Sequence, residues 1–152
     1  MKKPTEILLF LFVTLCFSAI FANAQQPPAY KISNVKIVPF EQTTGKFEAE
    51  ITANDDRSFF NDLGKGLFIT FEISGKPESY ADKRQLEVTV MEGTKIKLKK
   101  IYMTGILNEQ GKFYFPVWLD APMCSEVKIT ARITGQKPIA AITRKVAFQC
   151  GE

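Results

Sequence analysis

Apolar and polar residues alternate along most of the chain, which is the period of a β-strand with one buried side and one side facing solvent. The clearest example runs from Leu67 to Ile73, where every second residue is Leu, Ile or Phe. The alternation predicts about eight short strands and no long amphipathic helix. These strands are expected near residues 33–40, 46–53, 67–73, 86–92, 96–103, 112–119, 126–134 and 140–149.

The alternation is broken in the strand expected near 96–103. Ile96 and Leu98 would face inward, but the inward phase then passes to Ile101 and Met103. One extra residue in a strand resets which side points inward. A β-bulge is therefore expected at Lys99-Lys100.

The last two strands present a conflict of register. If Cys124 faces Cys150 across this hairpin, the apolar sides of the two strands do not match. A shift of one residue restores the apolar match and separates the cysteines, because such a shift reverses every side chain. Two explanations remain open, a bulge near Arg144-Lys145, which we favour, or a disulfide between strands that are not simple neighbours.

Short strands separated by turn residues predict one antiparallel β-sandwich over residues 31–152. The strand count and the C-terminal cysteine pair resemble immunoglobulin-like or fibronectin-III-like modules of secreted and cell-surface proteins. The chain departs from antibody-type domains because its two cysteines lie close together near the C-terminus. The resemblance implies a fold and no functional residue, since one fold hosts many functions.

Residues 1–24 have the layout of a secretory signal peptide: Lys2 and Lys3, then an apolar run, then Ala22-Asn23-Ala24. The run is shorter than the roughly 20 residues of a membrane-spanning helix, so we expect cleavage after Ala24 and no transmembrane segment in the mature chain. The rival interpretations are a membrane anchor and a lipoprotein attached through Cys16. Residues 25–30 would form a flexible leader. The predicted location is secreted, periplasmic or on the cell surface.

The expected export determines how the cysteines are interpreted. Cys16 would leave with the signal peptide, and the remaining pair, Cys124 and Cys150, would form a disulfide in an oxidising compartment. The chain contains no histidine, which excludes His-based triads and the commonest general base. We expect neither an enzyme nor a cofactor. A net charge of +4 without a dense basic stripe argues against a nucleic-acid partner.

Three groups of residues are candidates for binding. Asp55, Asp56 and Asp62 could supply oxygen ligands to calcium. The alternative is a solvated loop in which Ser58 caps one helical turn that ends at Gly64.

The second candidate is the solvent-facing side of the strand at 112–119. Tyr114, Pro116 and Trp118 would point outward together and form a flat surface for a sugar or a protein. Pro116 also indicates a sheet edge, because it cannot donate a ladder hydrogen bond. The alternative is that a loop carrying Phe59 and Phe60 covers these rings.

The third candidate is a basic stripe that could attract an anionic polysaccharide or lipid headgroups. It consists of Lys95, Lys97, Lys99 and Lys100. The alternative is that these lysines pair with Glu48, Glu50 or Glu87, or discourage edge-to-edge aggregation.

Together these features predict a secreted or cell-envelope, non-catalytic binding or adhesion module with a protein or carbohydrate partner. The alternative is a structural or accessory subunit that docks to a partner protein through an edge strand.

Overall fold

The computed structural model describes residues 29–55, 57–60, 64–120, 123–139 and 141–151. In these residues the chain forms β-strands and no helix, as the alternation predicts. The strands are β1 (Lys31–Glu41), β2 (Lys46–Phe47), β3 (Ser58–Phe60), β4 (Lys65–Ser74), β5 (Gln85–Glu92), β6 (Lys95–Met103), β7 (Lys112–Leu119), β8 (Val127–Thr134) and β9 (Ala141–Gln149).

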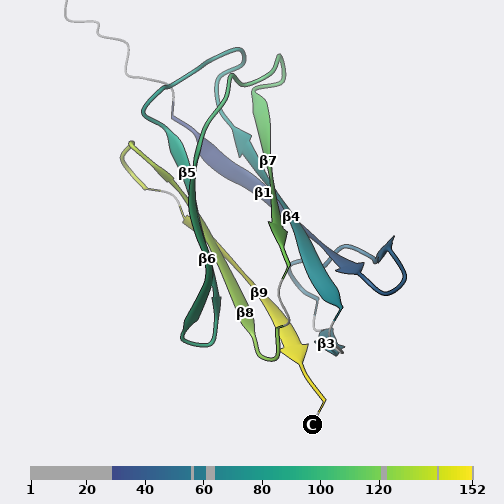
Figure 1. Ribbon diagram of the computed structural model, residues 1–152. Helices are drawn as coiled ribbons and strands as arrows, with labels where there is room; N and C mark the ends of the chain where they lie inside the picture. Colours follow the sequence, from purple (N-terminus) through teal and green to yellow (C-terminus); the bar gives the residue numbers. More distant parts are fainter. Residues whose placement is uncertain (1–28, 56, 61–63, 121–122, 140, 152) are drawn as a thin grey trace, which may run out of the picture.

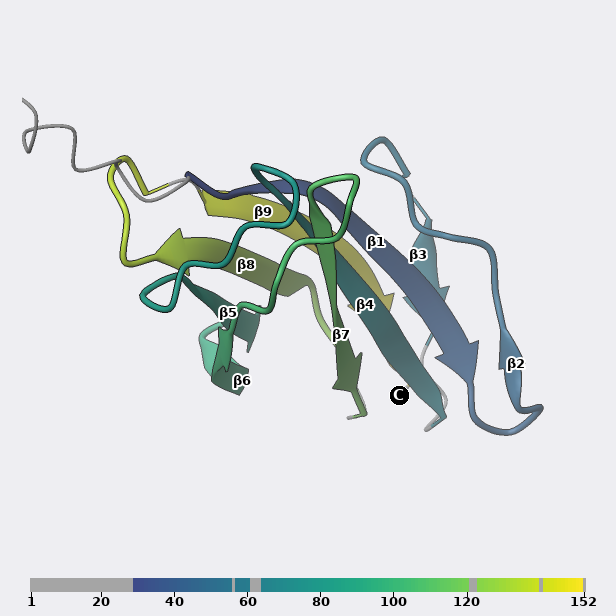
Figure 2. The same ribbon diagram turned by 90° about the horizontal axis from the view of Figure 1, so that it is seen from above.

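The strands form two sheets, one with the order β2-β1-β4-β7 and the other with the order β3-β9-β8-β5-β6. Figure 1 gives the course of the chain, and Figure 2 shows β1, β4 and β7 in one layer and β5, β6 and β8 in the other. Buried side chains from both sheets make one hydrophobic core. The expected β-sandwich is therefore confirmed. In the described part of the chain, no helix is long and apolar enough to cross a bilayer.

The core follows the predicted alternation in the central strands. Leu67, Ile69, Phe71 and Ile73 of β4 are completely buried, and so are Leu86, Val88 and Val90 of β5. β7 pairs with β4 along its whole length, so its side chains alternate in step with those of β4. The pairing with β4 therefore determines which side chains of β7 point outward.

Tyr30, the last residue of the expected leader, is also buried in the core. Its backbone N–H donates to Gln136 Oε1 at 2.9 Å, and its hydroxyl donates to the Ser79 carbonyl oxygen at 3.1 Å. The rest of that leader up to residue 28 and the expected signal peptide lie outside the described residues.

The segment from 46 to 60 differs from the prediction. Of the strand expected at 46–53, only Lys46 and Phe47 form a strand. The chain then follows β1 through single backbone hydrogen bonds, such as Ile51 N–H to the Ile37 carbonyl oxygen at 2.8 Å. Ser58 does not cap a helix: it begins β3, which pairs parallel with β9 and so makes the sandwich not wholly antiparallel. Buried Phe59 holds this short strand against the core.

β6 carries its bulge at a different residue from the expected one. The pairing of β5 with β6 shifts between Val90 and Met91, which leaves Lys97 as the extra residue and not Lys99-Lys100. The prediction that Ile96, Ile101 and Met103 face inward is wrong, since their side chains are exposed. Because the bulge lies at Lys97, Leu98 and Tyr102 are the residues of β6 that face the core, and Ile101 and Met103 point to the outer side.

β8 and β9 pair with Val127 opposite Val146 and Ala131 opposite Ile142, the register that matches their apolar sides. The described pairs continue through Arg144 and Lys145 without a shift, so the bulge that we favoured there is wrong. The expected disulfide between Cys124 and Cys150 is present, with Cα atoms 4.7 Å apart. Each cysteine lies just outside its strand, so the bridge does not require the two to face each other in the ladder.

Candidate functional site

Aromatic side chains from all four strands of the β2-β1-β4-β7 sheet meet on its outer side, the side away from the other sheet. The register places Phe40 opposite Phe47 and Phe68 opposite Trp118. Because Phe68 lies between the buried residues Leu67 and Ile69, its side chain points outward. Four rings that are distant in sequence therefore share one surface.

The four rings pack against each other in a continuous cluster. The ring centroids are 4.9 Å apart for Phe40 and Phe47, and 5.4 Å apart for Phe40 and Trp118. Phe68 lies 6.0 Å from Phe47 and 6.5 Å from Trp118. Phe47 is 59% exposed and Trp118 is 40% exposed, while Phe40 and Phe68 are half-buried. We call Phe40, Phe47, Phe68 and Trp118 the aromatic face.

Gly66 determines how Trp118 lies on the sheet. A Cβ atom at position 66 would be 3.0 Å from Trp118 Cζ2 and 3.2 Å from Cη2. The six-membered ring of the indole therefore occupies the space that a side chain at position 66 would need. In this position the indole reaches across β4 to Phe40 on β1.

The residues that the sequence placed on the outer side of β7 are found there. Tyr114 is 48% exposed, and Pro116 is exposed too. β7 is at the end of its sheet, as Pro116 indicated. Tyr114 lies opposite Glu72, four residues along the strand from Trp118, or about 13 Å at the usual rise per residue. It is therefore outside the aromatic face.

Phe59, from the loop considered as a possible cover, does not lie over Tyr114 and Trp118. Phe59 is buried and lies 5.7 Å from Phe148 of β9, centroid to centroid. The side chain of Phe60 is not among those described.

Several charged residues next to the aromatic face along the chain form ion pairs. Lys65 pairs with Glu48 and with Glu41, and Lys36 pairs with Glu50 at 3.7 Å. Burial lowers the pKa of Lys65, but the hydrogen bond and the charge of Glu48, together with Glu41, outweigh it and raise this pKa overall. These five charged side chains therefore already have partners of opposite sign within the chain.

The expected basic stripe does not act as one surface. Lys97, at the bulge, pairs with Glu92 at 2.7 Å, whereas Lys95, Lys99 and Lys100 are exposed. Glu48, Glu50 and Glu87, the partners that we considered, pair instead with Lys65, Lys36 and Arg132.

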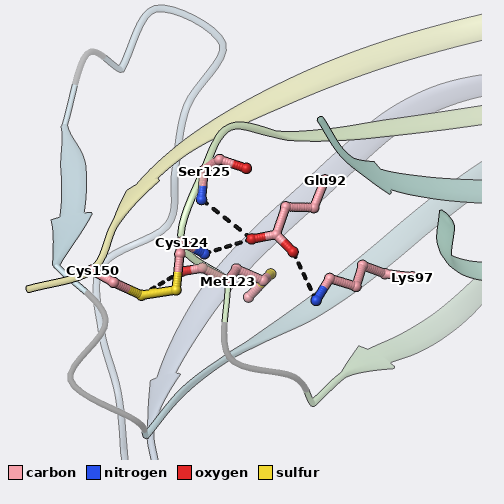
Figure 3. The surroundings of a disulfide bond; sticks show 6 residues. All are labelled: Glu92, Lys97, Met123, Cys124, Ser125 and Cys150. Carbon is pink, nitrogen blue, oxygen red and sulfur yellow. Dashed lines mark hydrogen bonds and ion pairs between the residues drawn. A yellow bond between two sulfur atoms is a disulfide. The ribbon is translucent and has the colours of Figure 1, made fainter. Parts of the chain in front are cut away.

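Glu92 connects the β5–β6 turn to the disulfide (Figure 3). Its Oε1 atom accepts hydrogen bonds from the backbone N–H groups of Cys124 at 2.5 Å and Ser125 at 3.2 Å, while Oε2 meets Lys97. The hydrogen bond from Lys97 is the main reason that the pKa of Glu92 is lowered, and the N–H of Cys124 adds to it. On the other side of the bridge, Cys150 Sγ lies 3.7 Å from the Met123 carbonyl oxygen.

The calcium hypothesis concerns a segment that is only partly described. Asp55 binds Arg57, whose hydrogen bonds lower the pKa of this carboxyl to about 2, and Arg57 also donates to the Glu50 carbonyl oxygen at 2.9 Å. Asp56 and Asp62 lie outside the described residues. Among the residues that are described, no three Asp, Glu, Cys or His side chains are grouped as metal ligands.

Half of the aromatic face is not apparent from the alternation in the sequence. Alternation over the strand expected at 46–53 puts Phe47 on the same, inward side as Ile51, and it does not single out Phe40. The turn at Thr43-Thr44-Gly45 was the available signal, because a hairpin there places residues 40 and 47 side by side. The sequence matches no protein-family model and no curated protein, so the function has to be inferred from the geometry of these surfaces.

Proposed function

We propose that this chain is an exported, non-catalytic binding module that docks a partner protein on the aromatic face. The observation that carries the proposal is the packing of Phe40, Phe47, Phe68 and Trp118 across every strand of one sheet, with two of the rings well exposed. Clustered, partly exposed aromatic anchors are typical of the energetic centre of protein–protein interfaces.

The geometry favours a protein over a polysaccharide. Neighbouring rings of the aromatic face are inclined to each other by 48° to 69°, so they do not present a coplanar row to a chain of sugar rings. The inclined rings leave an uneven apolar surface that suits aliphatic and aromatic side chains. The contact surface itself consists of four uncharged rings, so the partner surface is expected to be apolar and without a dominant charge.

The proposed type of sandwich is immunoglobulin-like, and most similar to fibronectin-III-like modules. Seven strands can be lettered A (β1), B (β4), C (β5), C′ (β6), E (β7), F (β8) and G (β9). The two sheets then read A-B-E and G-F-C-C′, with β2 and β3 added at the ends. Immunoglobulin constant domains likewise keep A, B and E in one sheet and C, F and G in the other, which supports this assignment.

Export also belongs to the proposal. The signal-like residues 1–24 support it, and so does the Cys124–Cys150 disulfide, since such bonds persist in oxidising compartments. The predicted setting is a periplasm, a cell surface or the exterior.

Site-specific photocrosslinking tests the docking surface. A photoreactive phenylalanine analogue at Phe47 should crosslink one defined protein in cells of the source organism, and the crosslinked peptide should be identified by mass spectrometry. Trp118→Ala should abolish this crosslink. The same analogue at Tyr80, which is exposed to a similar degree on a loop, should not yield it.

A glycan array tests the alternative that the aromatic face binds a sugar. Binding to a polysaccharide that Phe47→Ala or Trp118→Ala removes would overturn the protein partner and assign the aromatic face to sugars. An unchanged crosslink in Trp118→Ala would also refute the proposal.

A further inference from the structure

The four sheet ends differ in how much backbone they offer to another strand. β2 has two residues and β3 has three, and β7 carries Pro116 in its interior. β6 runs for nine residues from Lys95 to Met103 with neither proline nor glycine, and its pairing continues without a shift from the bulge at Lys97 to Met103. Among the described residues, β5 is its only neighbour in the sheet. β6 is therefore the end on which a further strand can be added over the greatest length.

The exposed side chains of β6 are both apolar and basic. Ile96, Ile101 and Met103 are 56%, 60% and 55% exposed. Ile101 and Met103 lie opposite Glu87 and Gln85, and Lys99 lies opposite Thr89, so these three point to the outer side of the sheet. Lys100 lies opposite the buried Val88 and so points to the inner side. An added strand would meet apolar and basic side chains together.

The exposed lysines of β6 have no acidic partner within the described chain. Lys95, Lys99 and Lys100 form none of its ion pairs. The two nearest carboxylates on β5 are already engaged, Glu87 with Arg132 at 2.8 Å and Glu92 with Lys97 at 2.7 Å. Lysines on an end strand discourage two copies from pairing, because like charges would face each other. They do not explain three exposed apolar side chains on the same strand.

From these observations we infer that β6 is a docking edge for an extended acidic segment of a partner protein, which adds as a further strand of the sheet. The segment carries two consecutive acidic residues, one to meet Lys99 on the outer side and one to meet Lys100 on the inner side. An apolar residue next to this acidic pair meets Ile101. The main chain supplies ladder hydrogen bonds, and the acidic pair fixes partner choice and register. This inference is independent of the aromatic face, which lies on the other sheet.

A pair of synthetic peptides tests the inference on the intact, disulfide-bonded protein. The first is a fluorescent ten-residue peptide with two central glutamates flanked by alternating valine and threonine, and the second has lysines in place of the glutamates. Fluorescence anisotropy should detect binding of the glutamate peptide only, and this binding should weaken as salt is added.

Charge reversal with a matched control sharpens the test. Lys99→Glu/Lys100→Glu should weaken binding of the glutamate peptide by about tenfold or more and should create binding of the lysine peptide. Lys76→Glu/Lys137→Glu changes the net charge equally at two exposed loop positions and should leave binding unchanged.

Hydrogen exchange separates strand addition from attraction by charge alone. With the glutamate peptide bound, the backbone amides in 95–103 that do not already bond to β5 should become protected. Binding without this protection, or equal binding of both peptides, would overturn the inference.

Anionic phospholipid vesicles test the alternative of a membrane surface. The inference would be overturned if the protein bound these vesicles and not the peptide, and if the same charge reversal abolished vesicle binding. Phe47→Ala/Trp118→Ala should not alter peptide binding, so failure of either proposal can be told apart from failure of the other.

Discussion

At position 66 the absence of a side chain lets the indole of Trp118 lie on the sheet and reach Phe40. An added Cβ would also lie 3.2 Å from the Leu119 carbonyl oxygen, a backbone atom that cannot easily move. The indole ring would therefore have to shift to make room for the Cβ. One glycine thus positions the largest ring of the aromatic face.

Gly66→Ala is expected to move the indole and to lower the free energy of unfolding by about 1–3 kcal/mol, as overpacking usually does. Urea denaturation followed by tryptophan emission measures both effects, because Trp118 is the sole tryptophan. Thr70→Ala, on the same outer side of β4, should change the emission spectrum little. An emission spectrum identical to wild type in Gly66→Ala would contradict this account of the glycine.

Glu92 offers a second test at the level of a single residue. Its lowered pKa, caused first by Lys97 and then by the Cys124 N–H, means that the ionised carboxylate stabilises the fold. For a group of this kind, the stabilisation is present above the unfolded-state pKa, about 4.3, and is lost as the pH falls through the lower folded-state pKa.

Glu92→Gln should therefore destabilise the protein by about 1.5–3 kcal/mol near pH 7, the usual value of hydrogen bonds to a charged group. Its difference from wild type should shrink as the pH falls below about 4.3, the pKa of the unfolded state, because the stabilisation by the charge is then progressively lost. Urea denaturation at pH 7 and pH 3 measures this. Glu109→Gln, on an exposed loop, serves as the control. An equal difference at both pH values would refute the role of the charge.

At the scale of elements, β3 depends on one side chain. Phe59 is buried against Phe148, while Arg57 and Lys65 lie 5.5 Å and 5.6 Å from its ring centroid. Three residues pairing parallel with β9 could not stay in place through their hydrogen bonds alone.

Phe59→Ala is expected to cost about 3 kcal/mol or more, as for other buried phenylalanines. Phe47→Ala, which removes the same ring from an exposed position, should cost much less. Denaturant titration of both variants compares them. Similar losses would mean that β3 is not anchored through Phe59.

The strands also differ in how closely they follow the alternation of apolar and polar residues. In β4, β5 and β8 one side contacts the core and the other does not, so alternation identified the buried residues correctly. In β6 the bulge lies at Lys97 and not at Lys99-Lys100, and its isoleucines were therefore wrongly assigned to the core. β2 and β3 are too short for any periodicity to be recognised.

At the scale of the whole molecule, the Cys124–Cys150 bridge closes the β8–β9 hairpin across 26 residues. Glu92 holds the Cys124 end against β5, so the bridge is joined to the neighbouring strand as well. The aromatic face, on the other sheet, does not touch it.

Cys124→Ser/Cys150→Ser should lower the free energy of unfolding by about 3–4 kcal/mol, the chain-entropy estimate for a loop of this length. Chemical denaturation measures this loss. Near-ultraviolet circular dichroism should still show the packed rings of the aromatic face. Loss of that signal under native conditions would show that the two sheets do not keep their structure independently of the bridge.

The sequence alone determined the seven longer strands, the cysteine pair and the outward direction of Tyr114 and Trp118, because these depend on local alternation and on composition. The tertiary structure alone decided that Phe40, Phe47 and Phe68 join Trp118, and that β6 exposes isoleucines beside unpaired lysines. Both features depend on strand order and register. Strand order and register are determined by contacts between residues that are distant in the chain, because they depend on which apolar sides can be buried together.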